Sequence, residues 1–384
     1  MQPLVSRRVL RTTILGLSLL ALGACSMFSS TDPRYEPVEL TQYEAEVAAG
    51  VRWSASVGGG GGYGFAPAVA GEAVYVATPN AVAKVDLASG RVLWRASPGI
   101  TLTAGAGSDG NTTAVAGGDG SVIAYDESGA EKWRARASSA VFVPPVVGSG
   151  VVVVRSTDYR IQAFDAATGE YRWDVQRPGP ALALKTSMQM LAAEGLIISG
   201  LPNGRLMAIN ASNGAVQWEA PISVSRGATD LERISDVVGA PQVVGPLLCG
   251  VTYQGRMSCF DVSQGGRPIW DIPFSSHTGM SNDGRFGYAA DQRDVVHAVD
   301  LATGEEQWRQ NALRNRRLAT PAVVPAAVAV ADFEGYVHFL SRSDGRLLGR
   351  LGVGGGAVLS PLVGTPAGVL VQTGNGNLVL VGVN

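Results

Sequence analysis

The chain of 384 residues contains very little lysine and no long run of charge of one sign. Lys84, Lys132 and Lys185 are its only lysines, and its formal net charge is −2. No stretch carries five like charges in succession, so the sequence has neither a basic arm for nucleic acid nor a polybasic patch for membranes. We therefore expect no nucleic-acid partner.

An apolar segment long enough to cross a membrane is missing from the N-terminus. Charged residues make up 16% of the chain and hydrophobic residues 46%, which excludes a disordered protein. The N-terminal apolar run, residues 14–22, has nine residues, whereas a membrane-spanning helix needs ~20. It follows Arg7, Arg8 and Arg11, an order typical of a signal peptide. We assign residues 1–24 to that signal peptide.

Cysteine is scarce too, and Cys25 stands directly after the apolar run. Residues 22–25 read Leu-Gly-Ala-Cys, which resembles the bacterial lipobox, in which the cysteine is lipidated and becomes the mature N-terminus. The alternative is an ordinary secretory signal that contains a cysteine. The polar stretch that follows favours the lipoprotein, with residues 25–50 as a lipidated tether and a short helix near residues 43–48. Ser26 in place of Asp implies the outer membrane, by the sorting rule of enterobacterial lipoproteins.

A repeat accounts for most of the rest of the chain. Seven tryptophans recur at intervals of 38 to 52 residues, a period typical of repeat architectures. Most follow an Asp or Asn and then a Gly, as in Asp165, Gly169 and Trp173, which predicts a tight turn before each Trp. A further copy has Gly349 where Trp would stand. The tryptophans are Trp53, Trp94, Trp133, Trp173, Trp218, Trp270 and Trp308.

Short β-branched runs separated by Gly, Asn and Asp precede each turn, and such runs form hairpins. Each unit of about 40 residues is therefore four antiparallel strands, and such units in series form a β-propeller. The strand at residues 51–53 lacks three partners, and the last set, residues 358–383, lacks one. We predict an all-β fold over residues 51–384. It is an eight-bladed β-propeller of four-stranded antiparallel blades, closed by pairing the N- and C-terminal strands in one blade, with the tryptophans packed between blades.

The repeat text, cleanest at residues 163–173, resembles the PQQ-like propeller repeat. Together with the lipobox at Cys25, eight such repeats resemble the BamB family of outer-membrane assembly lipoproteins. That resemblance implies a non-catalytic scaffold on the periplasmic face of the outer membrane that needs no cofactor. It implies binding to the POTRA region of BamA, the barrel subunit of the β-barrel assembly machinery, and help in folding and inserting outer-membrane β-barrels. Unfolded outer-membrane proteins are further partners to consider.

Two rival functions use the same fold. Quinoprotein dehydrogenases resemble this chain in repeat text but add a vicinal Cys-Cys pair and carboxylate ligands for Ca²⁺, and the sequence contains no Cys-Cys. His277, His297 and His338 show no ligand spacing, so we predict neither a metal site nor catalytic residues. A glycan-binding propeller would need an aromatic-lined funnel, and aromatic residues make up only 7% of the chain.

Two intervals exceed the usual length of the repeat. The spacing after Trp173 is 45 residues and that after Trp218 is 52, so we expect two longer loops on adjacent blades and on one face. Extra loop length on a rigid scaffold is where binding residues collect. In the first loop Leu182 and Leu184 alternate as in an extended segment with two apolar anchors. The second loop, residues 229–236, is the most charged stretch of the chain. The alternative is that the leucines cover the core and the charges are solvated.

The family resemblance makes these loops the partner-binding site. Its pattern is Leu-x-Leu-Arg in the first loop and Ser-Asp-x-Asp in the second, and Leu182, Leu184 and Asp236 match it. Lys185 replaces the Arg and loses its two-pronged hydrogen bonding, and residue 238 is Val where the family has the last Asp. We add Arg233 of the second loop as a candidate contact.

The remaining two cysteines, Cys249 and Cys259, lie in a predicted hairpin that turns near residues 254–255. A turn centred on residue 254 places them opposite each other, close enough for a disulfide, whereas a two-residue turn offsets them by one. Because an exported protein works in an oxidising compartment, we expect a disulfide between them.

Overall fold

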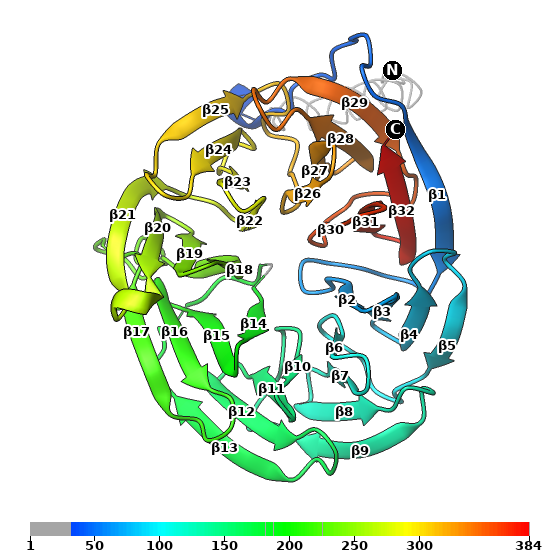
Figure 1. Ribbon diagram of the computed structural model, residues 1–384, viewed down its shortest axis with the longest axis vertical. Helices are drawn as coiled ribbons and strands as arrows, with labels where there is room; N and C mark the ends of the chain where they lie inside the picture. Colours follow the sequence, from blue (N-terminus) through cyan, green and yellow to red (C-terminus); the bar gives the residue numbers. More distant parts are fainter. Residues whose placement is uncertain (1–31, 181, 187, 225, 384) are drawn as a thin grey trace, which may run out of the picture.

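The computed structural model describes residues 32–384 except residues 181, 187, 225 and 384. Its strands form eight separate four-stranded antiparallel sheets, which stand side by side around a central axis as the blades of a ring (Figure 1). The predicted all-β, eight-bladed propeller is confirmed. We number the blades in chain order from the first complete one, so that blade 8 holds both ends of the chain.

Blades 1 to 7 run from an innermost to an outermost strand in sequence order, and in blade 8 the outermost strand is β1 (Figure 1). Blades 1 to 4 consist of β2 (Ala68–Ala70), β3 (Ala73–Thr78), β4 (Ala81–Asp86) and β5 (Val92–Ala96); β6 (Gly107–Ser108), β7 (Thr113–Ala116), β8 (Ser121–Tyr125) and β9 (Glu131–Arg136); β10 (Val146–Gly148), β11 (Val151–Arg155), β12 (Arg160–Asp165) and β13 (Tyr171–Gln176); β14 (Met190–Ala193), β15 (Leu196–Leu201), β16 (Arg205–Asn210) and β17 (Val216–Pro221). Blades 5 to 8 consist of β18 (Val237–Val244), β19 (Leu247–Thr252), β20 (Gly255–Asp261) and β21 (Arg267–Phe274); β22 (Met280–Asn282), β23 (Phe286–Ala290), β24 (Val296–Asp300) and β25 (Glu306–Gln310); β26 (Ala322–Val324), β27 (Ala327–Ala331), β28 (Tyr336–Leu340) and β29 (Leu347–Gly352); β30 (Val363–Thr365), β31 (Gly368–Gln372), β32 (Asn377–Val383) and β1 (Ala49–Ser56).

The two middle strands of each blade supply the core. Every residue of β11 and of β27 is buried, because a middle strand has a neighbouring blade on each side of its sheet. Both strands are rich in Val and Ala, which fit between stacked sheets. The outermost strands alternate instead, and in β13 only Trp173 and Val175 are fully buried. Burial on both faces explains why the sequence shows continuous apolar runs there rather than alternation.

The tight turn between the third and fourth strands forms as predicted. In blade 3 the carboxylate of Asp165 accepts hydrogen bonds from the backbone N–H groups of Ala167 and Thr168, both at 2.9 Å. Gly169 follows with φ of 76°, a left-handed conformation that side chains disfavour. The turn ends in a β-bulge that brings Trp173 opposite Ala163.

The tryptophans join neighbouring blades. The indole N–H of Trp173 donates to the carbonyl of Ala211 in the turn of the next blade, at 2.8 Å. A Cβ added to Gly214 of that turn would lie 2.9 Å from the Trp173 ring, so the turn packs flat on the indole. The same pairing recurs for Trp53, Trp94, Trp133, Trp270 and Trp308. The turn of blade 5 is longer and contains a 3₁₀ helix (Val262–Gln264), and there Trp218 packs edge-on against Phe260.

Ring closure also follows the prediction. β1 pairs antiparallel with β32, from Ala49 opposite Val383 to Ser56 opposite Asn377, so the two ends of the chain share blade 8. The turn that would connect β32 to β1 is therefore open. Blade 7 would need an eighth tryptophan to pack on that turn. Its outermost strand has Gly349 instead, and a Cβ there would lie 2.9 Å from the side chain of Val47.

Residues 34–48, which we call the strap, lie along the outside of blade 7 before entering β1. Their backbone bonds to the loop after β25 and to β29. The short helix expected near residues 43–48 does not form, because these residues lie against β29 in an extended path with one bend. The 3₁₀ turn Pro33–Tyr35 overlaps the start of the strap. None of the helices that the structure describes is long and apolar enough to span a membrane.

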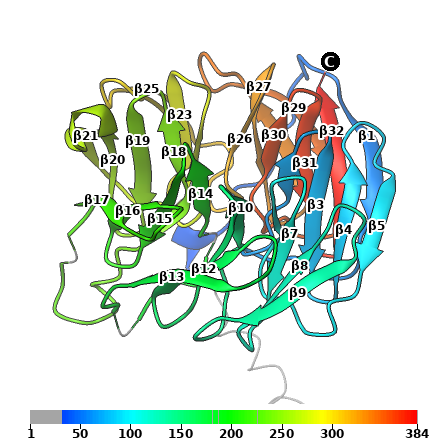
Figure 2. The ribbon, with the colours of Figure 1, turned by 60° about the horizontal axis from the view of Figure 1, so that its bottom comes forward.

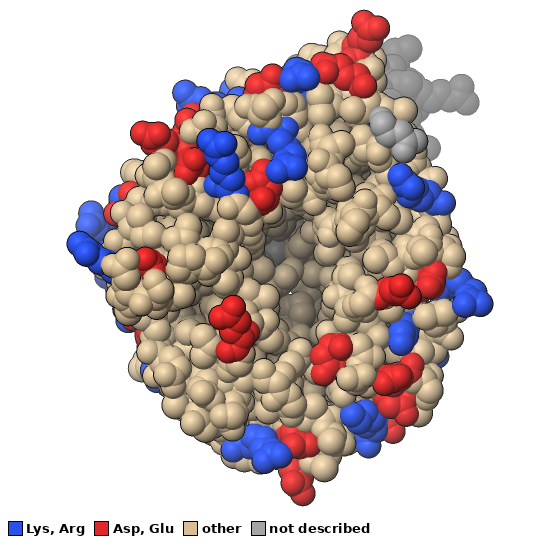
Figure 3. Space-filling model, in the orientation of Figure 1, with Lys and Arg blue, Asp and Glu red and all other residues tan. Residues whose placement is uncertain are grey.

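The two faces of the ring differ in their connections. One face, the loop face, carries the links from each outermost strand to the next blade together with the turns between the two middle strands. The opposite face, the turn face, carries the short turns that join the first strand to the second and the third to the fourth. The start of β1 and the end of β32 also lie on the turn face (Figure 2). The turn face is hollowed at the ring axis, and its charged side chains stand mainly towards the rim (Figure 3).

Candidate partner-docking site

The longest blade-to-blade connections lie next to each other on the loop face. Residues 177–189 link blades 3 and 4, and residues 222–236 link blades 4 and 5. The two connections touch, because the carboxylate of Asp236 at the end of the second accepts a hydrogen bond from the backbone N–H of Leu184 in the first, at 2.7 Å. The sequence placed both loops on one face; the bond between them could not be foreseen from spacing.

Asp236 is completely buried rather than presented to solvent. Its second carboxylate oxygen accepts from the backbone N–H of Asn203, at 3.3 Å. Burial raises the pKa of this carboxyl, while the hydrogen bonds from Leu184 and Asn203 and the charge of Arg155 oppose the rise. Asp236 therefore holds Leu184 in place and does not face a partner directly.

The two leucines of the first loop have different environments. The side chain of Leu182 is 48% exposed. Leu184 is half-buried and packs against the apolar clusters of blades 3 and 4 and of blade 5. Together they form an apolar ridge with one anchored and one free side chain, a typical arrangement for a contact surface.

Lys185 is exposed beside Leu184, and its ammonium lies 5.1 Å from the centre of the Phe142 ring, a cation–π contact. Phe142 belongs to the connection between blades 2 and 3 and is itself 38% exposed. The sequence analysis missed Phe142, because nothing in the spacing of that connection distinguishes it from its neighbours.

Arg233 acts mainly within its own loop. Its guanidinium donates to the carbonyls of Gly227 and Ala228 at 3.0 and 3.2 Å, and it lies 3.7 Å from the carboxylate of Asp230. Its side chain is 54% exposed. Exposed Leu231 and Val224 stand on the same loop.

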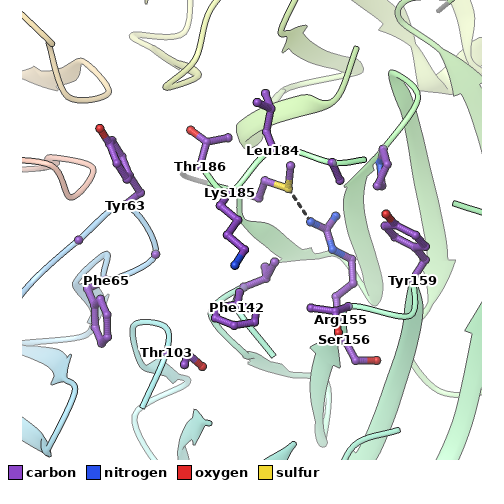
Figure 4. Close-up of a pocket in the computed structure, with 17 residues that line it drawn as sticks. Tyr63, Phe65, Thr103, Phe142, Arg155, Ser156, Tyr159, Leu184, Lys185 and Thr186 are labelled. Atoms are coloured by element: carbon purple, nitrogen blue, oxygen red, sulfur yellow. Dashed lines mark hydrogen bonds between the residues drawn. The ribbon is translucent and has the colours of Figure 1, made fainter. Parts of the chain in front are cut away.

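The ridge borders a cavity of about 410 Å³ on the loop face. Four aromatic residues line it from the connections and turns of blades 1 to 3 and 8, namely Tyr63, Phe65, Phe142 and Tyr159. Leu184 and Lys185 lie between Tyr63 and Tyr159, with Lys185 next to Phe142 (Figure 4). The glycine run 58–62 thus leads into Tyr63 and the cavity wall. Pockets of this size that combine apolar walls with a few polar groups are typical binding sites.

One cation lies buried at this cavity. The guanidinium of Arg155 donates to the carbonyl of Gly200, to the sulfur of Met188 at 2.8 Å and to the hydroxyl of Ser199 at 3.4 Å (Figure 4). Burial lowers the pKa of Arg155 to about 10, opposed by the charges of Asp236 and Tyr159. Arg155 is thus charged at neutral pH, and it places positive charge beneath the ridge.

The remaining predicted residues lie elsewhere. Cys249 and Cys259 stand directly opposite each other on β19 and β20 and are joined by a disulfide, with their Cα atoms 4.1 Å apart. Both are fully buried in blade 5, and the pairing corresponds to the turn centred on residue 254. Cys25 lies outside the described residues. In the described part of the chain, no three His, Cys, Asp or Glu side chains gather as metal ligands.

A ring of eight four-stranded blades with an apolar cavity and ridge on one face is a β-propeller that offers a binding surface. Comparison with known proteins specifies it further. The family model of the outer membrane protein assembly factor BamB matches residues 78–310 and 292–384. The chain belongs to the BamB family.

Individual relatives agree over nearly the whole length. The outer membrane protein assembly factor BamB of Bordetella pertussis is 61% identical over 378 residues, which cover 98% of both chains. That of Burkholderia pseudomallei is 40% identical, covering 93% of this chain and 94% of the relative. The crystal structure of BamB from Moraxella catarrhalis superposes with a TM-score of 0.80 at 21% identity, over 87% of this chain and all of that one.

The propeller of a redox enzyme has the same fold. Quinohemoprotein alcohol dehydrogenase from Comamonas testosteroni superposes with a TM-score of 0.66 at 13% identity, over 87% of this chain and 76% of that one. At an identity this low the similarity shows a shared fold only, and the chemistry of this chain has to be argued from its own residues.

Proposed function

We propose that this protein is a non-catalytic scaffold lipoprotein of the β-barrel assembly machinery. In this proposal a lipid on Cys25 anchors it to the periplasmic face of the outer membrane after removal of residues 1–24. The loop face binds the POTRA region of BamA and so aids folding and insertion of outer-membrane β-barrel proteins. The observation that carries the proposal is the ridge of Leu182 and Leu184, held on the loop face by the buried carboxylate of Asp236.

The ridge has the chemistry of an interface centre. Protein interfaces concentrate their binding energy in a few apolar anchors beside groups that pair with the partner. Leu182 supplies free apolar surface, and Lys185 supplies a charge that the ring of Phe142 holds close to it. An acidic group on the partner would complete this arrangement without the two-pronged geometry that an arginine offers.

The redox alternative has little support in the residues of this chain. The sequence contains no vicinal cysteine pair, and its two nearby cysteines are buried in blade 5 as a cross-strand disulfide. The glycan-binding alternative keeps one specific observation, the aromatic rings of Tyr63, Phe65, Phe142 and Tyr159 around the cavity. Sugars stack on such rings, so the test below includes a glycan.

The test is co-purification of the full-length lipoprotein with the POTRA domains of its partner. We expect the double variant Leu182→Ala/Leu184→Ala to lose at least ~30-fold in affinity, since anchors of this kind contribute ~2 kcal/mol or more. Leu93→Ala is the matched control, because Leu93 is 42% exposed on β5, away from the loop face. If the double variant recovered as much of the POTRA domains as the wild type, the contact would have to lie elsewhere on the ring. Capture of peptidoglycan fragments instead of POTRA domains would favour the glycan reading.

A further inference from the structure

The strap is fastened at its start to the loop face. The side-chain amide of Asn315, in the connection between β25 and β26, donates to the backbone carbonyls of Arg34 and Glu36 at 3.0 and 2.9 Å. The backbone N–H of Val38 donates to the carbonyl of Arg314 at 3.1 Å. The N-terminal end of the described chain thus leaves the ring at the face that carries the docking ridge.

Arg316 also holds the start of the strap, from a buried position beneath it. It is buried, its guanidinium donates to the carbonyl of Val38 at 2.9 Å, and it pairs with the buried carboxylate of Asp332 at 2.8 Å. Asp332 also bonds the ring of His338, at 3.0 Å. The strap is therefore tied into the polar interior of blade 7 and does not merely lie on its surface.

Further along, the strap crosses the outer wall of blade 7. The guanidinium of Arg350 lies 5.8 Å from the Tyr43 ring centre. The N–H groups of Glu46 and Val47 both donate to the carbonyl of Leu348, and Glu46 pairs with Arg346 through two bonds of 2.9 Å. The ten residues from Val38 to Val47 thus take the chain from the loop face to the turn face, where β1 begins.

The path of the strap shortens the link, by which we mean the segment between Cys25, the proposed lipid site, and the first residue that is bonded to the ring. From Cys25 to the first fastened residue, Arg34, there are nine residues, which span at most about 30 Å. Without the fastening the link would run from Cys25 to Ala49, 24 residues or up to about 80 Å.

We propose that the strap turns the loop face, with its docking ridge, towards the lipid bilayer. The inference rests on the proposed lipidation of Cys25. If the turn face were to meet the bilayer, the link would have to cross the wall of the ring, a distance of about 20 Å. Of its reach of at most about 30 Å, only about 10 Å would then remain to reach the lipid, whereas the whole reach is available when the loop face meets the bilayer. The partner that fits this geometry is a protein domain held close beneath the membrane.

The test measures energy transfer from probes on the ring to acceptor-labelled lipids, with the full-length lipidated protein in vesicles of phosphatidylethanolamine and phosphatidylglycerol. Probes are placed on single added cysteines at two positions around the ring. Asn311→Cys and Arg226→Cys lie on the loop face, and Ser343→Cys and Gln264→Cys on the turn face; all four residues are exposed. We expect higher transfer from both loop-face probes, because a six-residue strand such as β29 separates the faces by about 20 Å. Equal transfer, or higher transfer from the turn face, would overturn the proposal.

Two variants isolate the strap. Asn315→Ala with Glu46→Gln loosens it at both ends, and a 15-residue Gly-Ser insertion after Thr31 lengthens the link while leaving the strap untouched. In both we expect the difference between the faces to shrink, while affinity for POTRA domains in detergent stays at the wild-type value. An undiminished difference in the lengthened variant would show that the strap does not set the orientation.

Mass spectrometry of the N-terminal peptide reads the anchor separately. A Cys25 without acyl chains would refute the proposed anchor, and the orientation inference would fall with it. An acylated protein whose two faces transfer equally would refute the orientation inference alone.

Discussion

Asp236 lies where two loops of adjacent blades meet, and its two oxygens bind a backbone group from each side. One oxygen holds Leu184 of the docking ridge and the other holds Asn203 in the turn of blade 4. A buried carboxylate with two such donors defines loop geometry more strictly than an exposed charge does. The buried carboxylate thus positions the ridge and has no surface of its own to offer a partner.

We therefore expect Asp236→Ala and Asp236→Asn to differ. Alanine leaves the N–H of Leu184 unsatisfied, which costs about 1–3 kcal/mol and should weaken POTRA binding through a displaced ridge. Asparagine keeps one acceptor oxygen and should retain most of the stability and most of the affinity for POTRA domains. Urea unfolding and POTRA affinity of the two variants check this. If the two variants lost POTRA affinity equally while both kept wild-type stability, the charge itself would be the binding determinant.

The same residue gives a pH dependence with a definite sign. Burial raises the pKa of Asp236 above its ordinary 3.8, so the folded state holds this proton more tightly than the unfolded state. Its contribution to stability is complete below the ordinary pKa and is lost as pH rises through the raised value. Relative to Asp236→Asn, the wild type should lose stability as the pH rises above about 4, which unfolding curves at several pH values measure. If the difference in stability between the wild type and Asp236→Asn did not change with pH, the raised pKa of Asp236 would be contradicted.

The disulfide between Cys249 and Cys259 predicts that neither residue has a free thiol to react with a labelling reagent. Because the two sulfurs are joined in a disulfide, labelling of the denatured, unreduced protein should find neither of these thiols. Labelling after reduction serves as the positive control and should find both. Full labelling before reduction would show that the disulfide does not form in the exported protein.

At the scale of the element, the unit that repeats is a tryptophan of one blade on the turn of the next. Trp308 donates to the carbonyl of Arg342 at 2.9 Å, and a Cβ added to Gly345 would lie 2.4 Å from its ring. Glycine meets two demands there, since its φ is 74° and the indole leaves no room for a side chain.

These two demands can be separated by experiment. Gly245→Ala introduces a side chain at φ of 54° with nothing within 4 Å, so it carries only the backbone cost of ~1–2 kcal/mol. Gly345→Ala adds a steric clash with Trp308 and should cost a further ~1–3 kcal/mol. Thermal unfolding of both variants, and of Gly345→Ala in a Trp308→Ala background, checks this. An excess cost for Gly345→Ala that persists without the indole would exclude the clash as its cause.

The elements were largely predictable because each rests on local chemistry. Tight turns need Asp or Asn and Gly at fixed spacing, and Trp173 marks a position that carries tryptophan in seven of the eight blades, so sequence alone predicted eight blades and their closure. The binding surface was less accessible. Leu182, Leu184 and Asp236 could be named from loop length and family pattern, but Phe142 and Tyr63 come from other blades, and only the ring brings them to the cavity. The burial of Asp236 and the path of the strap likewise depend on contacts between distant segments.

For the molecule as a whole, the seam of blade 8 closes a ring of otherwise similar units. β1 contributes the outermost strand of that blade and carries Trp53, which bonds the turn of blade 1. Deleting residues 49–56 removes both contacts and leaves β32 as a bare edge. We expect the melting temperature to fall by more than ~10 °C and the transition to broaden, as in an opened repeat array.

The matched control deletes residues 26–31, which precede the strap, in a soluble form with Cys25 replaced by Ser. Calorimetry of this control should show the melting temperature of the undeleted soluble form. An equally small change on deletion of residues 49–56 would mean that the ring does not depend on its seam.

The seam also has a consequence for how the protein is made. Translation proceeds from the N-terminus, so β1 is made first, whereas β32, which pairs with it from Ala49 to Ser56, is made last. During that interval β1 is an unpaired edge strand, open to the wrong partner. A chain that breaks off late presents two such edges at once. A free strand edge therefore distinguishes an unfinished ring from a finished one.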